Sequence, residues 1–339
     1  MSRCVTVARG WGRVVVPAAV IALSLTGCGS AVQARAAAQA AVQPATAAQP
    51  AVAAGLSPST TLHLPVGTST QHLVVDGVRR SFIVTRPAGL PPHPALVLML
   101  HGGFGNAQQA EQAYGWDDAA RAHGFVVAYP DGLNHAWNVG AGCCGQPGQT
   151  GVDDVGFLTA TVRAISAAVP VDSRRVYATG MSNGGLMAYR LACDTDVFAA
   201  IGPDSATQLG DCPRPAPVSV IAIHGTADEN IPYAGGPGSG YEQIDGPSVP
   251  SVNAFWRGVD GCRTPTTTTL HRSQTVIESI AACPEGRGVE LVTIVGAGHQ
   301  WPGPDTRTPA QIRHGADKPS TAISATATIW SFFAAHPRP

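Results

Sequence analysis

Short, uninterrupted apolar segments in the middle of the chain constrain its fold most strongly. A strand is predicted over 218–223, and residues 95–100 and 125–129 are apolar throughout, without the alternation of a half-exposed strand. Such runs indicate strands buried on both faces, as in a parallel sheet covered by helices. Further strands are predicted over 175–179, 198–201 and 290–295, and helices over 106–123 (ending at Gly124), 152–169, 186–192 and 321–335. This alternation predicts an α/β fold with a mostly parallel central sheet and helices on both faces.

A hairpin is predicted before this alternating region. Residues 61–66 and 71–75 alternate between apolar and polar side chains, and Asp76-Gly77 then leads into residues 80–85. An Asp-Gly pair between alternating segments is typical of a tight hairpin turn. We therefore expect antiparallel strands at one edge of the sheet.

The first sixty residues are typical of a targeting segment. Arg3, Arg9 and Arg13 precede an apolar run over 14–25, which is too short for a stable transmembrane helix and resembles a secretory signal. The run ends in Leu25-Thr26-Gly27-Cys28, which is similar to the lipobox of bacterial lipoproteins, where the cysteine carries lipid. The alternative is an ordinary cleaved signal with a chance cysteine. Residues 29–60, rich in Ala, Gln and Pro, read as a low-complexity tether.

These segments predict a signal peptide with lipobox over 1–28, a tether over 29–60 and a catalytic domain over 61–339. The protein is then expected outside the cytoplasm or at the cell surface, either secreted or anchored by lipid on Cys28. The chain has 21 Lys and Arg against 22 Asp and Glu, a formal net charge of −1. Without a basic field, nucleic acid is excluded as a partner, and a membrane is contacted only through the lipid anchor.

A G-x-S-x-G motif carries the predicted chemistry. Gly180-Met181-Ser182-Asn183-Gly184 lies between the strand at 175–179 and the helix from 186. The motif alone is weak, but strand, tight turn and helix are the context in which it positions a nucleophilic serine. Glycines flank the serine because side chains there would collide with the neighbouring strand and helix. The sequence therefore predicts Ser182 as a nucleophile.

A serine nucleophile needs a base, and the base needs an orienting acid. Asp228 follows the strand at 218–223, and His299 follows the strand at 290–295, in the chain order serine, acid, histidine. His224 is the rival base and Glu229 the rival acid. His224 precedes Asp228 in the same loop, so we expect it to structure that loop.

The strand at 95–100 ends in His101-Gly102-Gly103-Phe104-Gly105, a match to the H-G-G type of oxyanion loop. The Gly103 N–H is the expected first oxyanion donor, with the Phe104 N–H as the alternative. The Asn183 N–H, directly after the nucleophile, is the expected second donor. A glycine-rich turn without a catalytic role is the other interpretation.

Together these segments resemble the polyhydroxybutyrate depolymerase-type esterases of the α/β-hydrolase fold. That group overlaps the feruloyl and acetylxylan esterases of carbohydrate esterase family one. Some members have cysteine where this chain has Gly103. The matching pieces are LHGG (100–103), Trp137-Asn138 with GCCG (142–145), VDDVGFL (152–158), GMSNGG (180–185), HGTAD (224–228) with Pro232-Tyr233, GHQWPG (298–303) and IWSFFAAHPR (329–338).

The resemblance implies a serine esterase that hydrolyses carboxylic esters with Ser182, His299 and Asp228, and it implies neither a metal nor an organic cofactor. The substrate stays open between a feruloyl or acetyl ester on polysaccharide, a 3-hydroxybutyrate oligomer and a lipid ester. A peptidase is less favoured, because this fold then usually adds a propeller or cap domain. In another functional class, the chain would be a surface binding protein on a hydrolase fold.

Six cysteines remain beyond Cys4 and Cys28, and in an exported protein they suggest disulfides. Cys262–Cys283 is the preferred pair, and Cys193 could pair with Cys212. Cys143 and Cys144 could then form a vicinal bridge or pair with other cysteines. Metal binding is the weaker alternative.

Trp301 and Trp137 follow strand ends on the expected active face, and with Phe104 they are candidates for the substrate cleft. The alternative for the tryptophans is core packing. Asp153 and Asp154 are read as a helix cap with loop-tethering contacts.

Overall fold

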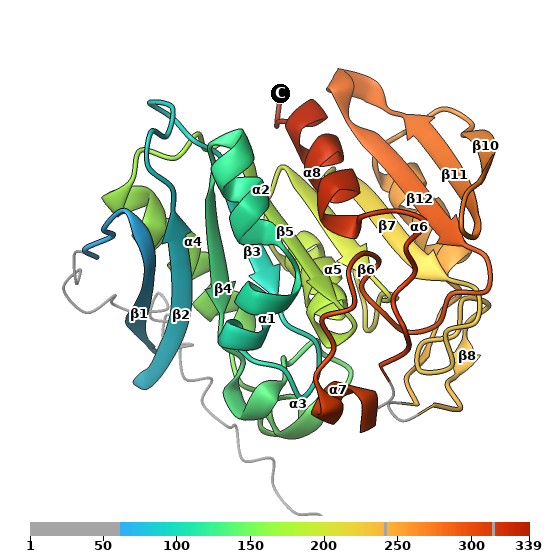
Figure 1. Cartoon of the computed structure of the whole chain (residues 1–339), viewed down its shortest axis with the longest axis horizontal. Helices are drawn as coiled ribbons and strands as arrows, with labels where there is room; N and C mark the ends of the chain where they lie inside the picture. The colour runs from blue at the N-terminus through green and yellow to red at the C-terminus, as the bar shows by residue number, and fades with distance from the viewer. Residues whose placement is uncertain (1–61, 241–242, 314–315) are drawn as a thin grey trace, which may run out of the picture. The chain divides into compact units, whose positions relative to one another are not determined.

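The computed structural model describes residues 62–240, 243–313 and 316–339, all within Leu56–Pro339, one of two units into which the chain divides. They form a ten-stranded sheet in the order β1-β2-β4-β3-β5-β6-β7-β12-β11-β10 (Figure 1). In that order the strands are β1 Gly67–Val75, β2 Val78–Arg86, β4 Val126–Pro130, β3 Leu96–Leu100, β5 Val176–Met181, β6 Ala200–Asp204, β7 Ser219–Gly225, β12 Gly288–Ile294, β11 Thr275–Ala282 and β10 Thr266–His271.

The six strands from β4 to β12 run parallel to one another, and the apolar runs predicted as buried strands lie among them. β3, β4, β5 and β7 are buried along their whole length, as expected of strands covered on both faces of the sheet. Antiparallel strands flank this parallel core on both sides. The predicted hairpin accounts for one edge, and the β10–β11 hairpin forms the other, which the sequence analysis missed.

Helices cover both faces of the sheet (Figure 1). On one face, α1 (Ala107–Ala113), α2 (Trp116–His123) and α8 (Ala325–Ala335) share a core with the sheet. On the other, α4 (Asp154–Ala168), α5 (Asn183–Asp194) and α6 (Val249–Val259) share a second core. The shorter elements are α3 (Gly145–Thr150), α7 (Pro309–Arg313), 3-10 turns at Leu133–His135 and Pro284–Gly286, and the small pair β8 (Gly236–Pro237) and β9 (Asp245–Gly246). In the described part of the chain, no helix has the length and apolar character to span a bilayer.

Two predicted elements differ from the structure. The helix expected over 106–123 is two helices, because Gly115 adopts a left-handed conformation (φ 71°) that ends the first and starts the second. The strand expected over 61–66 is wrong for residues 62–66, which precede β1 without forming a strand; residue 61 is not described. Gly124 ends α2 in the same left-handed conformation, as predicted.

The six cysteines of the described residues form three disulfides: Cys262–Cys283, Cys193–Cys212 and the vicinal Cys143–Cys144. Cys262–Cys283 links the segment after α6 to the end of β11, the strand next to the parallel core. The signal peptide over 1–28, Cys28 and the tether over 29–60 lie outside the described residues.

Candidate active site

Ser182 lies in a sharp turn between β5 and α5. Its backbone has φ 54° and ψ −123°, a conformation that side-chain-bearing residues rarely adopt. The turn holds because β3 and α5 approach closely: a Cβ on Gly184 would meet the backbone oxygens of Leu100 and His101. The glycine of the motif is therefore required by contact with the neighbouring strand, and the turn presents Ser182 at the carboxyl edge of the sheet.

His299 and Asp228 come together at the same edge. They follow β12 and β7, which pair in parallel, so both loops leave the sheet side by side. His299 Nδ1 lies 2.8 Å from Asp228 Oδ2, and Asp228 Oδ1 accepts the N–H groups of Asn230 and Ile231, each at 2.9 Å. Ser182 and His299 line one cleft. The three residues predicted as a catalytic triad are thus gathered at one place.

The environment of Asp228 favours its ionised form. Burial alone would raise the pKa of Asp228, but the charge of His299 and the hydrogen bonds from His224 and His299 hold it well below its usual range. His224 Nε2 lies 2.8 Å from the Ile231 carbonyl oxygen and 3.3 Å from Asp228 Oδ2. His224 therefore supports the acid, as expected, but from the end of β7 and not from the loop. Glu229, the rival acid, is exposed.

The candidate oxyanion loop, residues 101–105, is hydrogen-bonded to the segment that follows β4. The Phe104 N–H donates to the His135 carbonyl at 2.9 Å, so this N–H is occupied and Gly103 is the better candidate of the two. Asn183 begins α5, where the first N–H groups of a helix have no acceptor within the helix. The partial positive charge of this helix terminus favours a developing negative charge.

His101, the first residue of this loop, is fully buried and neutral. Its Nε2 accepts the Gly132 N–H at 2.9 Å, so its proton is on Nδ1, which donates to the Gly102 carbonyl at 2.8 Å. Burial lowers the pKa of His101 to about 4, which agrees with this neutral form. His101 therefore fixes the loop and is not a base.

The three aromatic cleft candidates differ in position. Phe104 is 51% exposed and lines the cleft beside Ser182. Trp137 does not line it, because its side chain is fully buried and hydrogen-bonds to the His101 carbonyl. Trp301 is also buried, packs against Tyr114, and borders only a smaller adjoining cavity. Sequence position after a strand identified the right face but could not show which way the indole rings turn.

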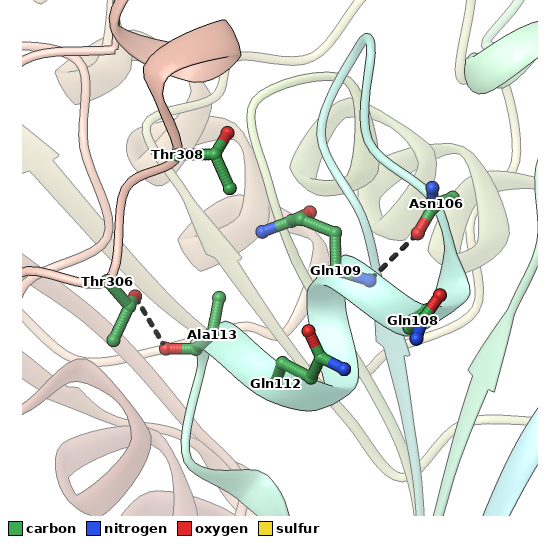
Figure 2. A pocket seen from close by; sticks show the side chains of 7 residues that line it. All are labelled: Asn106, Gln108, Gln109, Gln112, Ala113, Thr306 and Thr308. Atoms are coloured by element: carbon green, nitrogen blue, oxygen red, sulfur yellow. Dashed lines mark hydrogen bonds between the residues drawn. The ribbon is translucent and has the colours of Figure 1, made fainter.

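A groove lined by uncharged polar side chains continues from the cleft (Figure 2). It lies between α1 and the chain around Thr306 and Thr308, and the Thr306 hydroxyl donates to the Ala113 carbonyl at 2.9 Å. Gln109 lines both the cleft and the groove, and Figure 2 shows its amide directed toward Thr308. The remaining residues of the groove are Asn106, Gln108 and Gln112.

Asp204 is a buried carboxyl group beside the Ser182 turn, and sequence analysis did not single it out. Its carbonyl oxygen accepts the Ser182 N–H at 2.9 Å, and burial raises the pKa of its side chain well above the usual range. The predicted strand stopped at residue 201, whereas β6 continues to Asp204. Asp153 and Asp154 act structurally: Asp153 accepts the Gly156 N–H at 2.7 Å, and Asp154 pairs with Arg80. Across the described residues, no group of three or more His, Cys, Asp or Glu could hold a metal ion.

Comparison with known proteins gives the family. Residues 81–230, which contain the candidate oxyanion loop, the Ser182 turn and Asp228, match the family described as esterase PHB depolymerase. The chain is 31% identical over 268 residues to "Putative esterase NocK" of Nocardia uniformis subsp. tsuyamanensis, covering 70% of this chain and 74% of that protein. The chain belongs to the PHB depolymerase family of esterases. It is a carboxylic ester hydrolase, and the resemblance inferred from its motifs is confirmed.

Two further relatives extend the comparison. The chain is 32% identical over 236 residues to feruloyl esterase B of Piromyces equi, covering 65% of this chain but only 42% of that longer protein. The acetyl xylan esterase from Aspergillus awamori has a similar structure, with a TM-score of 0.52 and 16% identity over 78% of this chain and 99% of the other. That likeness supports the α/β-hydrolase fold.

Proposed function

We propose that the protein is an exported serine esterase that acts through Ser182, His299 and Asp228. The observation that carries this proposal is the 2.8 Å hydrogen bond between His299 Nδ1 and Asp228 Oδ2, beside a serine that lines the same cleft in a strained turn. An acid on one ring nitrogen of a histidine leaves the other nitrogen to act as a base.

The reaction proceeds in two halves. The Ser182 oxygen attacks the ester carbonyl carbon while His299 takes the hydroxyl proton, and the tetrahedral oxyanion is held by the Gly103 and Asn183 N–H groups. Collapse breaks the bond to the alcohol oxygen, which leaves with the proton from His299. Water then attacks the acyl-enzyme and gives its proton to His299. The carboxylic acid departs as the proton returns to Ser182.

The groove supports an ester whose alcohol portion is an uncharged, hydroxyl-rich group such as a sugar. Its amide and hydroxyl side chains offer both donors and acceptors but no charge. A polar neutral chain would therefore find partners there, whereas an acyl tail of a lipid would not. The relatives named as feruloyl and acetylxylan esterases agree with this substrate class. Exposed Phe104 at the cleft suits the apolar acyl side.

Three disulfides support export, because such bonds persist in oxidising compartments. We include in the proposal a signal peptide over 1–28 with lipid on Cys28, a tether over 29–60 and the catalytic domain over 61–339. In a bacterial host that processes lipoproteins, we expect the full chain to partition into detergent and a Cys28→Ala variant to remain in the aqueous phase. Equal partitioning of both forms would contradict the anchor.

The proposed activity is tested by initial rates of the exported full chain on methyl ferulate, acetylated xylan, 3-hydroxybutyrate oligomers and p-nitrophenyl butyrate. Each substrate is paired with a Ser182→Ala variant. We expect preference for a sugar-linked ester and loss of the activity in the variant. Preference for the hydroxybutyrate oligomer would contradict the proposed substrate class. Absence of any hydrolysis by the folded protein would favour a surface binding protein.

A further inference from the structure

One short segment contacts both loops that carry the proposed oxyanion donors. Residues 132–138, here called the clamp, follow β4. Toward the loop at 101–105, the Gly132 N–H donates to His101 Nε2 at 2.9 Å, and the His135 carbonyl accepts the Phe104 N–H at 2.9 Å. The loop that carries the Gly103 N–H is therefore fastened on either side of that residue.

Trp137 joins this loop to the other donor. Its indole Nε1–H donates to the His101 carbonyl at 2.9 Å. Its backbone N–H donates to Asn183 Oδ1 at 2.7 Å, and its carbonyl accepts from Asn183 Nδ2 at 3.2 Å. Trp137 is fully buried and Asn183 nearly so, so water does not compete for these bonds. One residue thus bridges the two segments that must face a single oxyanion.

The clamp is itself held from outside the active site. The Asn138 N–H donates to Asp154 Oδ2 at 2.7 Å, and Asp154 Oδ1 pairs with Arg80 of β2 at 2.6 Å. Asn138 Nδ2 also donates to the Val152 carbonyl at 2.8 Å. These contacts fix the clamp to the sheet and to the start of α4, so it can serve as a rigid spacer.

We propose that Trp137 is a positioning residue that sets the separation between the Gly103 and Asn183 N–H groups. The inference rests on the proposed function, because it assigns those N–H groups to one oxyanion hole. Stabilisation of an oxyanion depends on donors placed where the charge develops, so a small displacement weakens the transition state more than it weakens substrate binding. Trp137 touches no substrate and acts only through the donor loops.

The chain offers matched controls for the test. Trp137→Phe removes the indole donor, and Trp256→Phe removes an equally buried one, which donates to Gln208 at 2.9 Å away from the donor loops. Asn183→Ala keeps the backbone N–H but removes both bonds to Trp137. Asn253→Ala removes another buried amide, bonded to the Glu290 carbonyl and to Arg257. Thermal melting of all four variants reports their stability.

Hydrolysis of p-nitrophenyl butyrate and inhibition by phenylboronic acid, which forms a tetrahedral adduct on serine, are measured for each variant. Loss of a whole oxyanion donor lowers kcat about 100- to 1,000-fold, so a displaced donor is expected to lower it about 10- to 100-fold. We expect this loss for Trp137→Phe and Asn183→Ala. Inhibitor affinity should fall in parallel, KM should stay within about twofold, and the control variants should stay near wild-type rates.

Equal kcat values for Trp137→Phe and Trp256→Phe would overturn the positioning role. If Trp137→Phe does not fold, the comparison of Asn183→Ala with Asn253→Ala decides in the same way. A Ser182→Ala variant measured alongside distinguishes failure of the positioning role from failure of the proposed function. Loss of activity in Ser182→Ala together with normal rates in Trp137→Phe and Asn183→Ala overturns the positioning role of Trp137 alone. Full activity in Ser182→Ala overturns the proposed function and the clamp with it.

Discussion

Replacing Arg80 by Met should destabilise the fold by about 3–4 kcal/mol at pH 8. The Arg80 guanidinium lies 2.6 Å from Asp154 and 4.0 Å above the Phe157 ring, and both charged groups are buried. Met keeps most of the contact with Phe157, so the cost is mainly electrostatic. Removing one partner of a buried ion pair leaves an uncompensated charge and typically costs about 3–5 kcal/mol.

The cost should shrink at lower pH. Burial raises the pKa of Asp154 even beside Arg80, and loss of Arg80 removes an attraction that lowers it, so this pKa rises further. Asp154 in the folded variant binds a proton once the pH falls below its raised pKa. In the unfolded chain Asp154 binds that proton only below its ordinary, lower pKa. Each pH unit in that window recovers about 1.4 kcal/mol of stability. Because the pKa of Asp154 lies higher in the variant than in the wild type, we expect a smaller cost at pH 5 than at pH 8.

Urea denaturation at pH 5 and pH 8, followed by circular dichroism, measures both values. Arg121→Met is the surface control, because Arg121 pairs with Asp118 at 2.7 Å but is more than half exposed, and it should cost less than about 1 kcal/mol. In a double variant with Asp154→Leu, the costs should be less than additive. A cost for Arg80→Met below about 1 kcal/mol at pH 8, or an equal cost at both pH values, would refute this reasoning.

Three further predictions concern the active site and the sheet. Asp228→Asn should lower kcat on p-nitrophenyl butyrate about 1,000- to 10,000-fold with unchanged circular dichroism, because the amide cannot hold His299 in the required tautomer; a loss below tenfold would contradict that role. Gly184→Val should abolish activity and destabilise the fold by about 3 kcal/mol or more in urea denaturation, since the new side chain would meet the backbone of β3. Gly258→Ala is the control and should be neutral or stabilising, because a Cβ there meets nothing within 4 Å. Tolerance of Gly184→Val would contradict the close approach of β3 and α5. Burial and the nearby charge of Glu278 raise the pKa of Glu290 to about 7, so its ionisation costs stability as pH rises from about 4.5 to 7. Glu290→Gln should therefore melt like the wild type at pH 5 and be about 1–2 kcal/mol more stable at pH 8, and a gap independent of pH would rule the explanation out.

The parallel core of the fold could be predicted because its strands are mostly buried and largely apolar, and β3 is apolar throughout. The strand ends then placed Ser182, Asp228 and His299 at one edge of the sheet, where parallel strands put their following loops. The β10–β11 hairpin was not predicted for the opposite reason: β10 is largely exposed and threonine-rich, and β11 is mostly half-buried. The break at Gly115 depends on one backbone conformation that no hydrophobic pattern records.

The candidate site was less predictable where side-chain direction decides a role. Trp137 and Phe104 both follow strand ends, yet Trp137 is buried beneath the oxyanion loop and Phe104 is half exposed at the cleft. The motif assigns a role only to the backbone N–H of Asn183 and none to its side chain. That side chain nevertheless hydrogen-bonds to Trp137, which is 46 residues away in the sequence. Such long-range hydrogen bonds depend on the assembled fold and cannot be read from local spacing.

The central claim is that Ser182 is an activated nucleophile. Its most direct test is to treat the folded, exported chain with a fluorophosphonate and locate the adduct by peptide mass spectrometry. The account predicts one adduct per chain, on Ser182, abolished by Ser182→Ala or by prior unfolding and strongly slowed by His299→Ala. A folded chain that takes up no label, or takes it up at another residue, would contradict it.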